Sequence, residues 1–105
     1  MNDFTATETE PETLALAGEV GIYNADAVKQ ALIAFVSDTA TPRIDLSAVS
    51  DLDTCGVQLM LLARNEAQAR ERSIHWSGHS QAVLDALETF NLGALFDAPA
   101  TLLTN

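Results

Sequence analysis

Residues 42–57 decide the fold of this chain and read PRIDLSAVSDLDTCGV. Residues 43–46 predict a short buried strand, a polar loop follows, and the apolar residues from Val57 onward predict a long helix. Asp53 and Thr54 are residue types that often cap a helix start. The unpaired N–H groups and the dipole of a helix start also favour an anion such as phosphate. The stretch therefore predicts a strand–loop–helix junction. Its polar residues cap the helix, form an anion-binding site, or do both.

Asp45, Asp51 and Asp53 allow one metal-based interpretation, a magnesium-assisted phosphotransfer site, because hard cations take oxygen ligands. The sequence has no Gly-x-x-x-x-Gly-Lys phosphate loop, and no lysine lies near these aspartates. We therefore predict no metal site and no cofactor. The aspartates are expected to accept backbone N–H hydrogen bonds and to shape the loop.

Nucleophilic catalysis at this junction is also disfavoured. Cys55 lies at a helix start, where thiolates are stabilised, but three acidic residues oppose that charge and no histidine is near in the sequence. Thr54 would need an adjacent general base to act as a nucleophile. As a phosphate acceptor it needs only exposure to a kinase that brings its own ATP and metal. The residues favour a switch protein over an enzyme; a small hydrolase remains a third alternative, which loss of turnover in Cys55→Ala would support.

A second polar cluster contains His75, Ser77, His79 and Ser80. The two histidines lie on either side of a turn, which is not the spacing of a zinc site. Asp85 is the nearest acid along the chain that could complete a catalytic arrangement. We interpret the cluster as polar residues on an edge strand.

Composition limits the classes of function. The chain has 105 residues, 48% of them hydrophobic, which suits one domain with a single core. Its net charge of -10 disfavours nucleic acid and anionic membrane surfaces as partners. One cysteine excludes an internal disulfide. Because residues 1–12 are acidic and no long apolar run is present, we expect neither a secretory signal nor a membrane-spanning segment. We expect a cytoplasmic protein.

The order of elements predicts an α/β domain with a small mixed sheet and helices packed largely on one face. Residues 1–12 are expected to form a flexible N-terminus or a weak edge strand around Phe4, and residues 13–105 to form the domain. The strands are predicted at residues 13–17, 43–46 and 73–77, and the helices at residues 24–36, 54–70 and 81–89. The predicted core comprises Val28, Leu32, Phe35, Ile44, Leu46, Val57, Met60, Leu61, Trp76, Leu84, Leu87 and Phe96.

Arg64, Arg70 and Arg72 supply most of the positive charge. They follow the apolar first half of the long helix and suit the negative end of its dipole. A solvated helix end is the favoured interpretation, and a small partner-facing patch is the alternative.

Asp-Leu-Ser at residues 45–47, five linking residues and Asp-Thr-Cys-Gly-Val at residues 53–57 resemble the signature of the STAS family. That family includes bacterial anti-sigma factor antagonists and the cytoplasmic ends of sulfate transporters. The resemblance extends with less specificity from about residue 13 to residue 96. It implies that Thr54 is phosphorylated by a serine/threonine kinase. It also implies that a partner binds around Asp51, Asp53, Thr54, Cys55, Gly56 and Gln58. The glycine at position 56 is predicted to allow a close approach, either of the partner to the helix start or of the loop to the sheet.

The resemblance implies a non-catalytic bacterial signalling protein whose partner is an anti-sigma factor-like serine/threonine kinase. Thr54 replaces the serine common in some members, and Cys55 stands where a second hydroxyl is frequent. The identity of the kinase is therefore left open. The alternative is an adaptor subunit of a lipid ABC transporter or of a chemotaxis or stress-signalling complex. In that case Thr54 would contact a partner such as the transporter ATPase, without obligatory phosphorylation.

Overall fold

The computed structural model describes residues 3–10 and 12–99 and has an α/β architecture, as predicted. Residues 100–105 of the predicted domain lie outside the described part. The elements are β1 (Phe4–Glu10), β2 (Thr13–Val20), the 3-10 helix η1 (Ile22–Asn24), α1 (Ala25–Asp38), β3 (Arg43–Leu52), α2 (Thr54–Ala69), β4 (His75–Ser77), α3 (Gln81–Thr89) and the 3-10 helix η2 (Gly93–Phe96).

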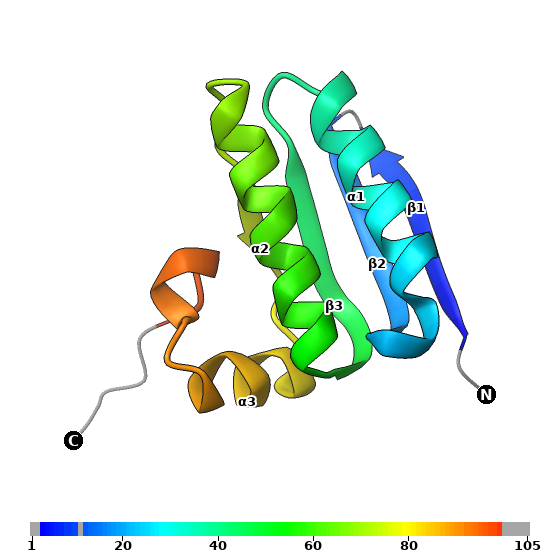
Figure 1. Ribbon diagram of the computed structural model, residues 1–105, viewed down its shortest axis with the longest axis vertical. Coiled ribbons are helices and arrows are strands. Elements are labelled where there is room, and N and C mark those ends of the chain that lie inside the picture. Colours follow the sequence, from blue (N-terminus) through cyan, green and yellow to red (C-terminus); the bar gives the residue numbers. More distant parts are fainter. Residues whose placement is uncertain (1–2, 11, 100–105) are drawn as a thin grey trace.

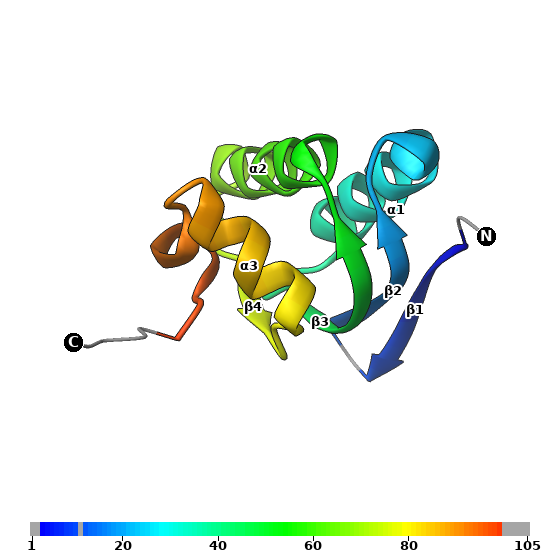
Figure 2. The ribbon, with the colours of Figure 1, turned by 90° about the horizontal axis from the view of Figure 1, so that it is seen from below.

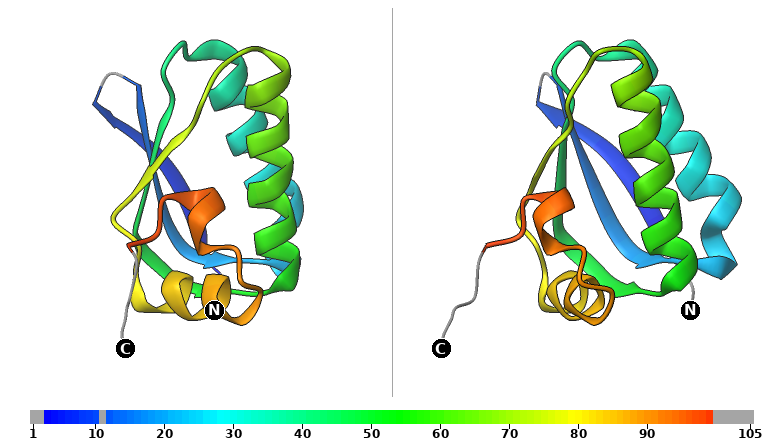
Figure 3. Two further views of the ribbon diagram at one scale, coloured as in Figure 1. Left: turned by 90° about the vertical axis from the view of Figure 1, so that its left-hand side faces the viewer. Right: turned by 60° about the vertical axis from the view of Figure 1, so that its left-hand side comes forward.

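The four strands form one mixed sheet in the order β1-β2-β3-β4. β1 is antiparallel to β2, whereas β2 is parallel to β3 and β3 is parallel to β4. The chain passes from β2 to β3 through α1 and from β3 to β4 through α2. Figure 1 and Figure 2 show α1 and α2 side by side on one face of the sheet. Figure 3 shows α3 at the end of the sheet where β3 finishes. The predicted mixed sheet with helices largely on one face is confirmed.

β3 is longer than the four residues that the sequence predicts, because it continues through the presumed loop to Leu52. Its buried side chains are Ile44, Leu46, Val49 and Leu52, so their spacing changes from two residues to three. The pairing with β2 contains two register shifts at this point, which is the signature of β-bulges. These bulges interrupt the strand's period of two and make the second half resemble a loop in the sequence.

β2 also exceeds its prediction and continues through Gly18 to Val20. Gly18 adopts a φ of 91° within the strand, a conformation that glycine tolerates. The chain turns after this strand, at Gly21 and η1. Asn24 occupies the N-cap position of α1 without a side-chain cap bond. Its side-chain amide instead donates a 2.8 Å hydrogen bond to the Glu19 carbonyl oxygen.

The hydrophobic core lies between the sheet and the inner faces of α1 and α2, with α3 and η2 closing one end. Ten of the twelve predicted core residues are buried, and the exceptions are Leu61 and Leu84, which are only half-buried. The first half of α2 is apolar nearly all round, but the helix lies at the surface and buries one face, which includes Val57 and Met60. Among the described residues, no helix combines the length and apolar character needed to span a bilayer.

Two members of the histidine and serine cluster, His79 and Ser80, have structural partners. His79 Nε2 donates a 2.6 Å hydrogen bond to the Phe96 carbonyl oxygen, and the Ser80 hydroxyl accepts one from Val83 N at the start of α3. Trp76 packs edge-to-face on Phe96 with ring centroids 5.0 Å apart. The contacts of Trp76 and His79 with Phe96 hold η2 against β4 and the turn that follows it.

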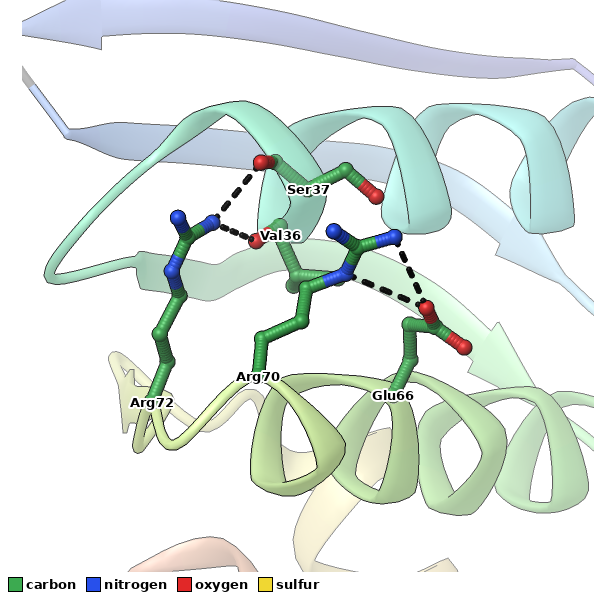
Figure 4. A network of polar contacts seen from close by, with 5 residues as sticks. All are labelled: Val36, Ser37, Glu66, Arg70 and Arg72. Carbon is green, nitrogen blue, oxygen red and sulfur yellow. Dashed lines mark hydrogen bonds and ion pairs between the residues drawn. The ribbon is translucent and has the colours of Figure 1, made fainter.

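Two of the arginines after α2 have structural partners (Figure 4). Arg72 Nη1 donates 2.7 Å hydrogen bonds to the carbonyl oxygens of Val36 and Ser37, in the last turn of α1. Arg70 pairs with Glu66 at 3.1 Å, one turn earlier on α2. Arg72 therefore satisfies carbonyl groups that a helix end leaves unpaired and ties α1 to α2.

Arg72→Ala is expected to lower the free energy of unfolding by about 1–2 kcal/mol, because two charge-assisted hydrogen bonds to a helix end are lost. Arg70→Ala is the matched control: it removes an exposed i,i+4 ion pair worth about 0.3–0.5 kcal/mol. Urea denaturation of both variants measures the difference. Equal losses would show that Arg72 contributes no more than a surface ion pair.

Candidate functional site

The candidate site lies at the edge of the sheet where β2 and β3 end. Because these strands are parallel, their last residues, Val20 and Leu52, are paired across the sheet. η1 and α1 follow β2, and α2 follows β3, so the starts of both long helices meet at this edge (Figure 1). The backbone of Ile22 and the side chain of Asp53, 31 positions apart in the sequence, are thereby brought together.

Asp53 joins the start of α2 to η1. It is the N-cap of α2, where its Oδ1 accepts a 2.9 Å hydrogen bond from Gly56 N. Its Oδ2 accepts a 3.0 Å hydrogen bond from Ile22 N in η1. Gly21 lies so close that a Cβ there would fall onto the Asp53 carboxylate. One carboxylate therefore fixes both the start of α2 and the position of η1.

Asp53→Ala is expected to reduce the free energy of unfolding by about 1–2 kcal/mol, through loss of the helix cap and of the bond to η1. Asp53→Asn provides the control, since asparagine is also a good N-cap but offers only one acceptor oxygen. We expect an intermediate loss for Asp53→Asn in thermal melts. If both variants have the melting temperature of the wild-type chain, the Asp53 carboxylate does not stabilise the start of α2 or the position of η1.

Thr54 is the first residue of α2 and is exposed. Gln58, one turn later on the same helix face, is exposed as well. Asp51 is exposed at the end of β3, and its Oδ1 lies 3.1 Å from Leu52 N. Cys55 is half-buried. The structure thus places Asp51, Asp53, Thr54 and Gln58 on one accessible edge.

Gly56 requires a correction, because it is buried rather than presented to a partner. A Cβ at this position would collide with the Val20 carbonyl oxygen and approach Leu52 Cδ1 to 2.6 Å. The close approach is therefore that of α2 to the end of the sheet. Gly56 is therefore a packing residue: of the two predicted approaches, the structure has the one to the sheet, and the predicted partner contact does not fit this geometry.

The three aspartates do not converge into a metal site. Asp45 lies in the first half of β3, where its Oδ1 accepts a 2.9 Å hydrogen bond from Ser47 N. Asp51 lies six residues further along the strand, about 20 Å away at the rise of an extended chain. Each of the three carboxylates accepts a backbone N–H, which confirms the interpretation that they shape the chain.

Two residues that the sequence reasoning missed belong to this edge, Ile22 and Tyr23 in η1. With Glu19, Asp51 and Asp53 they line a recess of about 60 Å³. This volume holds water but is far below the roughly 300–1,000 Å³ of small-molecule sites. The sequence signal that could have identified them is a pair of large apolar residues between Gly21 and the start of a predicted helix. The recess is therefore too small for a typical small-molecule ligand.

Comparisons with known proteins agree with this architecture. A family model described as "Mlab, STAS domain" matches residues 4–103. No curated protein matches the chain significantly. An anti-sigma factor antagonist from Mycobacterium paratuberculosis matches with a TM-score of 0.80 and 24% identity, over 96% of this chain and 89% of that chain.

Two structures of the anti-sigma factor antagonist SpoIIAA are also similar. The unphosphorylated form matches with a TM-score of 0.68 and 18% identity, over 93% of this chain and 89% of that chain. The phosphorylated form from Bacillus matches with a TM-score of 0.64 and 17% identity, over 93% and 92%. At these identities the likeness establishes the shared fold. Together with the family model, which extends over almost the whole described chain, it shows that this chain belongs to the STAS family.

Proposed function

We propose that this chain is a non-catalytic protein-binding switch resembling an anti-sigma factor antagonist, and that Thr54 is its phosphate acceptor. The observation that carries the proposal is the position of Thr54, exposed as the first residue of α2 and next to the capping Asp53. A hydroxyl on such a rigid, accessible junction is easily presented to a kinase. The kinase supplies ATP and metal, so the acceptor needs no catalytic apparatus of its own.

The partner surface comprises the edge around Thr54 and the exposed face of the first turns of α2, including Gln58. Phosphate on Thr54 adds about two negative charges to an edge that already contains Asp51 and Asp53. A partner that binds the unmodified edge must then accept or desolvate the added charge, which weakens binding. The proposed partner is an anti-sigma factor-like serine/threonine kinase in a bacterial cytoplasm.

The relatives support this proposal by analogy. SpoIIAA is known in an unphosphorylated and in a phosphorylated form, and this chain has a similar fold to both. Because this fold accommodates phosphorylation in SpoIIAA, the similar fold of this chain supports phosphorylation here.

The test is to incubate the purified chain with kinase-containing extract from its own cell and ATP, and to map the modified peptide by mass spectrometry. We expect phosphate on Thr54. Ser47 and Ser50 are exposed on β3 and serve as internal controls for nonspecific labelling. Phosphate found only at those serines would overturn the assignment of Thr54.

The second candidate is an adaptor subunit for which phosphorylation is not obligatory, as in the transporter alternative. The observation that favours it is the description of the matching family model, which names an Mlab-type STAS domain. In this case Thr54 and Gln58 contact a transporter ATPase directly. Tight binding to such an ATPase by a chain that no kinase labels would favour the adaptor over the switch.

A further inference from the structure

Ile22 and Tyr23 are the most exposed large apolar side chains in the described residues. Their exposed fractions are 65% and 77%, whereas the next, Phe90, is 42% exposed. They follow one another in η1, beside the start of α2. Exposed apolar groups that cluster at a functional edge are typical of interaction sites, whereas scattered ones are ordinary.

The turn that presents these two side chains is fixed by several hydrogen bonds. Ile22 N donates to Asp53 Oδ2, Asn24 N donates to the Gly21 carbonyl oxygen at 3.0 Å, and the Asn24 side chain donates to the Glu19 carbonyl oxygen. A rigid turn loses little conformational entropy when a partner covers it. Ile22 and Tyr23 are therefore already arranged for binding.

Acidic groups surround the pair. Glu19, Asp51 and Asp53 line the same recess, and Asp26 is exposed in the first turn of α1. The chain's five basic residues lie elsewhere: Lys29 is a turn further along α1, Arg43 begins β3 at the opposite end of the strand, and Arg64, Arg70 and Arg72 lie in the second half of α2 or beyond it. This edge is thus an apolar pair within an acidic border.

We propose that Ile22 and Tyr23 form an anchor that enters an apolar pocket bordered by lysine or arginine residues on the partner protein. The inference rests on the proposed function, because it concerns the partner that binds the edge around Thr54. Tyrosine is enriched among residues that dominate binding energy, especially at the centre of an interface. The acidic border steers a basic partner toward the anchor and sets its orientation.

Site-specific photo-crosslinking in the native cell tests the anchor. A photoreactive benzoylphenylalanine replaces Tyr23 in one version of the chain, Gln58 in a second and Phe90 in a third. We expect positions 23 and 58 to crosslink to the same protein and position 90 to give no such adduct. The adduct from position 23 should map to a partner segment that contains lysine or arginine; a segment without basic residues would overturn the stated chemistry.

The partner identified in this way is then purified for affinity measurements. Tyr23→Ala is expected to weaken binding tenfold or more, whereas Phe90→Ala, the matched aromatic control, changes it less than twofold. Tyr23→Ala should melt close to the wild-type temperature, since the side chain is 77% exposed, and a melt of Phe90→Ala measures the cost of removing its partly covered ring. A twofold or smaller effect of Tyr23→Ala would overturn the anchor.

Failure of the anchor and failure of the proposed function give different results. Crosslinking at position 58 without crosslinking at position 23 supports the proposed partner surface around Thr54 and refutes the anchor. Crosslinking at position 23 in a chain that is never phosphorylated supports the anchor and refutes the switch. Absence of adducts at both positions refutes both proposals.

Discussion

Gly56→Val is expected to abolish folding of the chain under conditions in which the wild-type protein is stable. The Cβ alone would meet the Val20 carbonyl oxygen and Leu52 Cδ1, and the two methyl groups of valine add volume where α2 contacts the end of the sheet. Overpacking usually costs about 1–3 kcal/mol, but here the obstacle includes backbone, and small domains have only about 5–15 kcal/mol to lose. Circular dichroism and urea denaturation measure the outcome.

Gly56→Ala provides a graded version of the same experiment. Alanine is favoured over glycine in a helix by about 1 kcal/mol, so the collision and the helix propensity have opposite effects on stability. We expect the collision to dominate and the free energy of unfolding to fall by about 2–3 kcal/mol. Gly93→Ala is the control, since a Cβ there meets only the Ala98 Cβ at 3.4 Å, an ordinary contact. A stabilised Gly56→Ala variant would show that α2 can move away from Val20.

The role of Gly56 illustrates what the sequence could not provide. A glycine in the first turn of a helix indicates that something approaches closely, but the approaching group, the Val20 carbonyl oxygen, belongs to a strand 36 residues earlier in the chain. The contact depends on the parallel pairing of β2 and β3, which is a property of the folded sheet. Local patterns indicated the close approach without identifying its partner.

Local signals were sufficient where a residue acts on its own helix. Asp53 caps α2, as its residue type and position indicated, and Ser80 caps α3 through the same kind of local contact. The spacing of Val28, Leu32 and Phe35 correctly predicted the buried face of α1. Each of these interactions joins residues within a few positions of one another, so the sequence contains the whole pattern.

Strands were underestimated because their stability comes from neighbouring strands. β1 has few large apolar residues, but it pairs along most of its length with β2 and packs Phe4 and Ala6 against the core. Its sequence alone indicated at best a weak strand around Phe4. The same limitation applies to Ile22 and Tyr23, whose importance depends on their proximity to Asp53 in the fold.

Thr54→Glu is expected to weaken binding of the partner about 5- to 30-fold, which corresponds to about 1–2 kcal/mol. The added carboxylate lies near Asp51 and Asp53, and burying it against a partner costs energy through repulsion and desolvation. Within the chain the effects are small, since the start of α2 attracts a negative charge by about 0.3–1 kcal/mol while the nearby carboxylates repel it. Affinity should therefore fall while the melting temperature stays close to that of the wild type.

Thr54→Gln separates charge from size, because glutamine matches glutamate in shape but is neutral. We expect it to bind much more tightly than Thr54→Glu, and Thr54→Ala to bind as the unmodified chain does while accepting no phosphate from the kinase. Titration calorimetry with the purified partner, alongside thermal melts, compares the three variants. If Thr54→Gln and Thr54→Glu weaken binding equally, shape rather than charge controls the edge, as in the adaptor alternative. If Thr54→Ala is still labelled, the phosphate acceptor lies elsewhere in the chain, because position 54 then has no hydroxyl to receive it.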